Sequence, residues 1–169
     1  ALLEILHEGR DVALVSDAGT PVLSDPGTDL VAAARASGIA VVPIPGPSAV
    51  ATALSAAGLK GDRYLFLGFI PRKGSERARL LARAAAEEWS VVFFEAPPRL
   101  ADLLEDLVRA VGGGRRAVVA RELTKLHEEL AQLVDEARVD AGAGLVEQHE
   151  PGRGHERHRD VDELLLAVA

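Results

Sequence analysis

The sequence predicts an α/β fold made of two α/β units. Short apolar runs of strand length alternate with helical patterns, and loops rich in Gly, Pro and Ser separate them. In the N-terminal unit, a strand–loop–helix order that occurs twice at this spacing indicates parallel strands joined by right-handed crossovers. The 169 residues are 48% hydrophobic, which is enough for one large domain or two small ones.

The first unit is expected to cover residues 1–60. Apolar positions at 2–6 predict a helix, and the run at 12–16 predicts a short buried strand. A helix is expected at 28–37, because Asp25-Pro-Gly leads into it and Gly38 is a typical stop.

The same order then repeats once within the first unit. Residues 39–43 form the next predicted strand. Ser48 is a suitable N-cap for a helix at 49–57, which Gly58 terminates.

The second unit is expected at residues 61–133 and to contain three strands and two helices. The strands are predicted at 64–70, 91–94 and 117–120. Ser75 is predicted to cap a helix at 75–88. Residues 100–111 form an amphipathic helix with an apolar stripe of Leu103, Leu104, Leu107 and Val111.

Residues 134–169 lack a core periodicity and are expected to form a poorly ordered tail ending in a short helix at 164–168. Three histidines of this tail, His149, His155 and His158, have a spacing that a zinc site could use. The sequence contains no cysteine and gives these histidines no helical frame, so we expect no metal site.

Charge and composition limit the function classes. The net charge is −7, which argues against a general nucleic-acid binder, and only residues 60–129 have a positive balance, with 13 basic and 11 acidic side chains. No apolar run approaches the roughly 20 residues of a membrane span, so no membrane partner is expected. The lack of cysteine fits a cytoplasmic protein.

Two loops of the first unit are candidates for a ligand site. Ser16-Asp-Ala-Gly-Thr-Pro21 is neither a dinucleotide-binding nor a phosphate-loop motif, and Gly19 serves either an ordinary turn or the approach of backbone to a ligand. Pro45-Gly-Pro-Ser48 is either a helix entry or a ligand-facing loop, and Ser48 can serve both purposes. Side by side, the loops would form a crevice lined with backbone N–H groups, which suits an anionic or zwitterionic small molecule.

Six motifs occur in an order and spacing that resemble a known family. They are Val15-Ser-Asp-Ala-Gly-Thr-Pro21, Ser24-Asp-Pro-Gly27, Pro45-Gly-Pro-Ser-Ala49, Gly68-Phe-Ile-Pro-Arg-Lys73, Phe93-Phe-Glu-Ala-Pro-Pro-Arg-Leu100 and Ala120-Arg-Glu-Leu-Thr-Lys125. From residue 1 to about residue 129 the chain resembles the ribosomal RNA small-subunit methyltransferase I family of the tetrapyrrole methylase superfamily.

The resemblance implies a two-domain tetrapyrrole methylase-like fold, that of the class III S-adenosylmethionine-dependent methyltransferases. It implies 2′-O-methylation of a cytidine ribose in the decoding region of 16S rRNA, with S-adenosylmethionine as cofactor, the small ribosomal subunit as partner, and a homodimer. The implied cofactor-binding residues are Ala18, Gly19, Thr20, Pro21, Leu23, Ser24, Pro45, Ser48, Ala49, Glu95, Ala96, Glu122 and Leu123.

A ribose 2′-hydroxyl is a weak nucleophile that benefits from a base or a hydrogen-bond acceptor. Glu122 and Asp17 are the carboxylates expected at strand ends, and Lys125 lies near Glu122, so Glu122 and Lys125 are the predicted catalytic residues. A structural ion pair between Arg121 and Glu122 at the surface is the alternative. The predicted RNA-binding residues are Arg72, Lys73, Arg77 and Arg121.

The chain is expected to depart from this family at both ends. It lacks the family's N-terminal segment, and its tail is expected to diverge from the family's last strand. The acidic net charge favours one alternative function, a methylase of a tetrapyrrole ring such as a corrin precursor. The expected departure at both ends favours another, a non-catalytic remnant of the enzyme.

Overall fold

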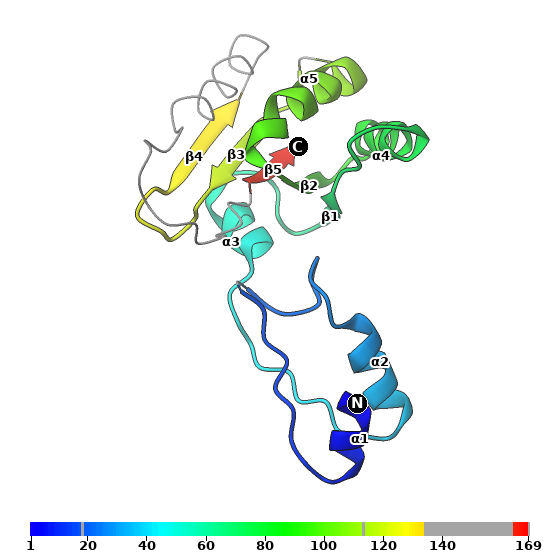
Figure 1. The fold of residues 1–169 in the computed structure, drawn as a ribbon. Coiled ribbons are helices and arrows are strands. Elements are labelled where there is room, and N and C mark those ends of the chain that lie inside the picture. The colour runs from blue at the N-terminus through cyan, green and yellow to red at the C-terminus, as the bar shows by residue number, and fades with distance from the viewer. Residues whose placement is uncertain (18, 113, 134–163, 169) are drawn as a thin grey trace, which may run out of the picture. The chain divides into compact units, whose positions relative to one another are not determined.

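The computed structural model describes residues 1–17, 19–112, 114–133 and 164–168 of the chain (Figure 1). It divides into two compact units, Ala1–Ser48 and Ala49–Ala169. The elements, in chain order, are α1 (Leu2–His7), α2 (Thr28–Ala36), α3 (Ala49–Ala56), β1 (Tyr64–Phe69), α4 (Ser75–Ala86), β2 (Ser90–Glu95), the 3₁₀ helix η1 (Pro97–Arg99), α5 (Leu100–Val111), β3 (Ala117–Arg121), β4 (Glu129–Leu133) and β5 (Leu164–Val168).

Unit 1 contains the two predicted helices but, in its described part, no strand. The predictions of strands at 12–16 and 39–43 are wrong. A strand requires a hydrogen-bonded neighbour as well as apolar residues, and neither segment has a ladder partner among the described residues. Apolar side chains in both segments are consequently exposed, to 81% at Val15 and 79% at Val42.

Unit 2 is built around a five-stranded mixed sheet with the order β1-β2-β5-β3-β4. β1 and β2 run parallel, whereas the parallel pair predicted for the first unit does not form, because its two strands are absent from the described part of that unit. β5 lies between β2 and β3 and is antiparallel to both, and β4 is antiparallel to β3 at the edge (Figure 1). The carboxyl ends of β1, β2 and β3 therefore lie at one edge of this sheet.

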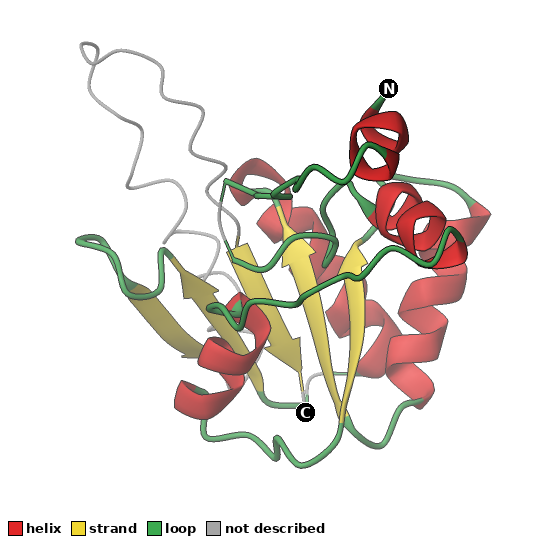
Figure 2. Cartoon of the chain, turned by 90° about the horizontal axis from the view of Figure 1, so that it is seen from below, coloured by secondary structure: helices red, strands yellow, loops and turns green. Residues whose placement is uncertain are grey.

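Helices cover both faces of the sheet, because alternate residues of the inner strands are apolar in both directions. On one face Val91, Phe93 and Val119 pack with apolar residues of α4 and α5. On the other face Val92, Phe94 and Val118 pack with those of α3. Figures 1 and 2 show α3 on one side of the strands and the α4–α5 pair on the other.

The division between the units falls after Ser48, earlier than the expected division near residue 60. The physical reason is the packing of α3. Val50, Ala53 and Leu54 are buried in the cluster that contains β2 and β3 residues, so this helix belongs to the core of unit 2.

The C-terminal part of the chain contains two strands that the sequence analysis did not foresee. Residues 164–168 were expected to be helical, and they form β5 in the middle of the sheet. Two flanking strands supply its hydrogen bonds, so tertiary pairing decides the conformation of this short apolar run. β4 was not predicted at all, and the histidines of the tail lie outside the described residues.

Most elements of unit 2 match the predicted pattern, and α5 has the predicted bounds. Its stripe is confirmed, since Leu103, Leu104 and Leu107 are all buried. One expected cap is wrong: α4 begins at Ser75, its N-cap is Gly74 with φ +98°, and no side-chain cap bond is formed.

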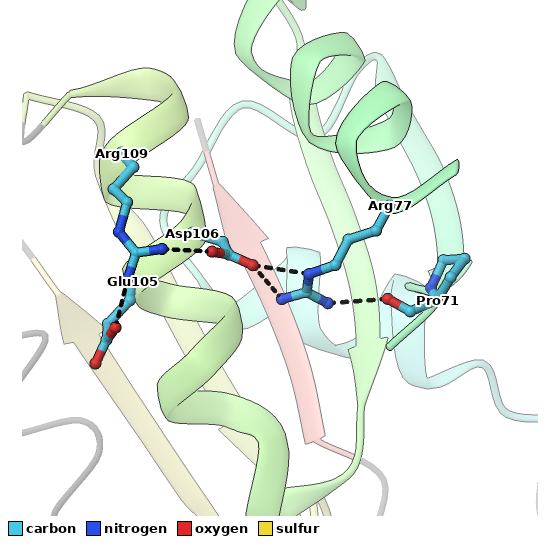
Figure 3. Close-up of polar contacts among 5 residues, drawn as sticks. All are labelled: Pro71, Arg77, Glu105, Asp106 and Arg109. Carbon is cyan, nitrogen blue, oxygen red and sulfur yellow. Dashed lines mark hydrogen bonds and ion pairs between the residues drawn. The ribbon is translucent and has the colours of Figure 1, made fainter. Parts of the chain in front are cut away.

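A charged network joins α4 to α5 (Figure 3). The Nε and Nη2 atoms of Arg77 lie 2.7 and 2.6 Å from Asp106 Oδ2, and Arg77 Nη1 donates to the carbonyl of Pro71 at 3.0 Å. Arg77 is 11% exposed and Asp106 is 27% exposed, so water competes little for these contacts. Arg109 extends the network along α5 by pairing with Asp106 and Glu105.

Replacing Arg77 by Ala is expected to lower the free energy of unfolding by about 2 kcal/mol, because it breaks a largely buried charged pair and leaves a carbonyl without its donor. Urea denaturation followed by circular dichroism measures the change. The control is Arg79→Ala, which removes an exposed pair with Glu76 and should cost less than about 0.5 kcal/mol. Equal losses in the two variants would show that the network does not stabilise the helix pair.

Candidate functional site

The two candidate loops of unit 1 are in contact. Thr20 Oγ1 donates to the carbonyl oxygen of Pro47 at 3.4 Å. A Cβ added at Gly19 would lie 3.5 Å from the same oxygen, and one added at Gly46 would lie 3.5 Å from Thr20 Oγ1. The predicted approach of these loops is therefore present, and side chains larger than hydrogen at 19 and 46 would fill the space between them.

The first loop holds several residues in the left-handed region. Gly19 has φ +72°, which glycine adopts without steric cost, but Val22 at +77° and Ser24 at +65° are strained. Ser16 Oγ donates to the carbonyl of Gly19 at 3.3 Å and closes the start of the loop. Strained non-glycine residues concentrate at functional sites, because the surrounding structure must hold them there.

The other predicted cofactor residues of unit 1 differ in exposure. Leu23 is 61% exposed, and Pro45 is exposed as well, whereas Pro21 and Ser48 are half-buried. Ala18 lies outside the described residues. Asp17 is exposed at the start of the same loop.

In unit 2, the ends of the strands place four residues in one row. Glu95 is opposite Leu164, which is opposite Arg121, which is opposite Glu129. Alternation along β2 and β3 puts Glu95 and Arg121 on the α4–α5 face, with β5 between them. Two strand spacings separate their backbones by about 10 Å, so this row brings the carboxylate and the guanidinium to the same edge of the sheet.

Glu95 is fully buried, and its carboxylate serves the local fold. Oε1 accepts the N–H of Ala96 at 2.8 Å and pairs with Nη2 of Arg99. Oε2 is buried without a hydrogen-bond partner. Ala96 is half-buried at the end of β2, and Ala49 begins α3 as an exposed residue.

Glu122 and Leu123 lie in the loop that joins β3 to β4. Nη2 of Arg121 is 3.8 Å from Glu122 Oε1, and Nη1 is 3.8 Å from Glu129 Oε2. The side chains of Arg121 and Glu122 are 11% and 15% exposed, so the ion pair considered as an alternative exists but is partly buried and does not lie at the open surface. Leu123 packs on the α3-side core, and Lys125 is exposed.

The predicted RNA-binding residues fall into two groups. Arg72 and Lys73 are exposed in the turn between β1 and α4. Arg77 is engaged by Asp106 and Pro71, and Arg121 by Glu122 and Glu129. A phosphate contact by either of these two arginines would require breaking contacts inside the protein.

Two features of the site were missed at the sequence level. The carboxylate of Glu128 accepts the N–H of Thr124 at 2.5 Å, and Arg99 pairs with the buried Glu95. The i to i+4 spacing of Glu95 and Arg99 is a weak signal for the second pair, and nothing in the spacing indicates the first. Among the residues that the structure describes, no group of three potential ligands could hold a metal ion.

The comparisons with known proteins place these residues in a family. The model of the Tetrapyrrole (Corrin/Porphyrin) Methylases matches residues 1–137. Ribosomal RNA small subunit methyltransferase I of Mycobacterium tuberculosis (strain ATCC 25618 / H37Rv) is 50% identical over 147 residues, which are 86% of this chain and 52% of that protein. The protein of the same name from Escherichia coli O157:H7 is 51% identical over 129 residues, 76% of this chain and 45% of its own length.

We expect from the sequence motifs that the family resemblance ends near residue 129, but the similarity extends beyond that residue. Ribosomal RNA small subunit methyltransferase I of Mesorhizobium japonicum is 46% identical over 183 residues, covering 99% of this chain and 60% of that protein. The chain thus spans about half the length of the curated relatives it matches.

Solved structures share the fold at low sequence identity. Cobalt precorrin-4 methyltransferase, a cobalamin biosynthetic enzyme, has a TM-score of 0.65 at 15% identity, covering 98% of this chain and 67% of that one. Uroporphyrin-III C-methyl transferase from Thermus thermophilus, complexed with S-adenosyl homocysteine, has a TM-score of 0.53 at 14% identity, covering 88% and 62%. The predicted tetrapyrrole methylase-like fold is confirmed.

Glu95→Ala is expected to lower the free energy of unfolding by about 3 kcal/mol, since it leaves Arg99 without its partner and opens a cavity beneath the sheet edge. Glu95→Gln keeps an oxygen for the Ala96 amide and should lose about half as much. Chemical denaturation measures both changes. Glu105→Gln, which alters a pair whose carboxylate is 62% exposed, is the control and should be near neutral. A Glu95→Ala variant as stable as this control would contradict the structural role.

Proposed function

This chain belongs to the tetrapyrrole (corrin/porphyrin) methylase family, and from that premise we propose that the protein transfers a methyl group from S-adenosylmethionine to the 2′-hydroxyl of a cytidine in 16S rRNA. One observation carries the proposal: the identity of about 50% to relatives named ribosomal RNA small subunit methyltransferase I. The tetrapyrrole enzymes among the solved structures share only 13–23% identity, and that degree of likeness speaks for the fold alone.

The loops of unit 1 fit the methionine part of S-adenosylmethionine, which carries a carboxylate, an ammonium and a sulfonium group. They offer backbone N–H and carbonyl groups together with the hydroxyls of Ser16, Thr20 and Ser24. Gly19 and Gly46 lie where these loops meet, and added side chains there would fill the space between them. Backbone groups held by a rigid loop recognise a zwitterion without charged side chains of their own.

For unit 2, taken by itself, we assign roles to residues at the ends of β2 and β3. The family resemblance assigns Ala96 and Leu123 to the adenosine, and Glu95 fixes the turn that leads into η1. Glu122 is the proposed acceptor for the proton of the 2′-hydroxyl, and Arg121, 3.8 Å away, holds its carboxylate. Lys125 is exposed and is assigned to the substrate phosphate.

The chemistry is a displacement in which an oxygen–carbon bond forms as a carbon–sulfur bond breaks. S-adenosylmethionine supplies the activated methyl group. The protein has to orient donor and acceptor, exclude water and receive one proton, and Glu122 is the group proposed for that proton. The homodimer remains a prediction from the family resemblance, and the cytoplasmic location remains a prediction from the absence of cysteine.

Gly19→Ala is expected to raise the dissociation constant for S-adenosylmethionine about tenfold, because it adds a methyl group where the two loops meet and strains a φ of +72°. Isothermal titration calorimetry measures the change. Gly38→Ala is a matched control, since Gly38 also has φ +72° but has no atom within 4 Å of the added Cβ. Equal affinities of the two variants would contradict the site. No binding by the unmodified chain would favour a non-catalytic remnant.

Replacing Arg72 and Lys73 by Ala is expected to weaken binding of a decoding-region RNA hairpin and to reduce the salt dependence of its affinity. Each lost phosphate contact lowers the slope of log K against log salt by about 0.7 to 0.9. Fluorescence anisotropy over a salt series measures the slope. Arg10→Ala with Arg35→Ala changes the net charge equally in unit 1 and should leave the slope unchanged. Methyl transfer to a corrin precursor and not to RNA would support the alternative enzyme.

A further inference from the structure

The loop that joins β3 to β4, residues 122–128 (the hairpin loop), carries the proposed proton acceptor and is folded back on itself. β3 and β4 pair up to Arg121 opposite Glu129. Beyond that pair, the N–H of Lys125 donates to the carbonyl of Glu122 at 2.9 Å, and the N–H of Glu128 donates to the carbonyl of Lys125 at 3.3 Å. The backbone thus makes two consecutive tight turns.

These turns require an unfavourable backbone conformation. Glu122 has φ +46° and Thr124 has φ +68°, in the left-handed region that glycine favours. Thr124 is β-branched, so its side chain is crowded in this region. Without a compensating contact, the hairpin loop would be expected to relax to an extended conformation and carry Glu122 with it.

Three contacts hold the hairpin loop, and they act at different places. At the start of the hairpin loop, Arg121 forms ion pairs with Glu122 and Glu129. Leu123 packs against the core on the α3 side. At the tip, Glu128 Oε2 accepts the N–H of Thr124 at 2.5 Å. Hydrogen bonds to a carboxylate are stronger than those between neutral groups, and in this structure the bond forms with Thr124 in the left-handed conformation.

We propose that Glu128 is a positioning residue of the methyl-transfer site. Its carboxylate binds the Thr124 amide and so holds the strained turn that presents Glu122 and Leu123. Glu128 itself touches neither the cofactor nor the substrate. The inference rests on the proposed function, because it assigns Glu128 a part in a site that includes Glu122 and Leu123.

The test separates a backbone role of Glu128 from a role of its charge. Glycine adopts positive φ without cost, so Thr124→Gly should make the turn independent of the carboxylate. Four variants of the full chain are compared with the unmodified chain: Glu128→Ala, Glu128→Gln, Thr124→Gly and the double variant Thr124→Gly/Glu128→Ala. Glu76→Ala, which removes an exposed carboxylate from α4, is the control for net charge.

Two readouts are used. The first is hydrogen exchange of the Lys125 amide, whose bond to Glu122 reports on the turn whether or not any ligand binds. We expect its protection to fall about tenfold in Glu128→Ala, less in Glu128→Gln, and to recover in the double variant. The second is the dissociation constant for S-adenosylmethionine, which should rise three- to tenfold in Glu128→Ala and return to within twofold in the double variant.

Each outcome supports or overturns the proposal. Unchanged Lys125 protection in Glu128→Ala overturns it, as does a loss of affinity that Thr124→Gly does not rescue. If the unmodified chain fails to bind S-adenosylmethionine, the proposed function fails for this chain, and the exchange readout still decides whether Glu128 holds the turn. If binding is intact and every variant equals Glu76→Ala, the positioning role alone is refuted.

Discussion

Unit 2 depends on the burial of β2 on both faces. Every residue from Ser90 to Glu95 is buried, with β1 parallel on one side and β5 antiparallel on the other. The middle of a strand in this position, here Val91–Phe94, must be apolar, because helices cover it above and below. α3 and the α4–α5 pair are therefore required by the same run of residues, and the two cores meet at this strand.

The apolar run of β2 ends at a polar residue, Glu95. Glu95 closes β2 as a fully buried carboxylate, and a buried charge is costly unless it is paired. Arg99 and the Ala96 amide supply the partners, and both come from the segment that immediately follows the strand. The same carboxylate thus fixes the turn into η1 and the start of α5. Glu95 therefore shapes this part of the candidate site, although its own side chain is buried.

The sequence predicts those parts of the fold whose reasons are local. The stripe of α5 is visible in Leu103, Leu104 and Leu107 because a helix repeats its face every few residues. The strand at 164–168 could not be predicted, because its conformation depends on β2 and β3, which lie far away in the sequence. The strand predictions at 12–16 and 39–43 are wrong because the apolar residues there are typical of strands, but no described neighbour pairs with them. In the candidate site, the sequence singles out Gly19 because glycine indicates backbone freedom, whereas Glu128 gives no signal, since its partner is a backbone amide.

Among the described residues, four non-glycine residues have positive φ: Val22, Ser24, Glu122 and Thr124. All of them lie in segments that the motif resemblance connects with the cofactor, although that resemblance contains no information about backbone angles. A strained conformation persists only where neighbouring contacts hold it, and each of the two loops has such contacts: Thr20 to Pro47 in one, and Thr124 to Glu128 in the other. Strained non-glycine residues of this kind concentrate at functional sites, so the backbone angles alone single out these two loops as candidates for ligand binding.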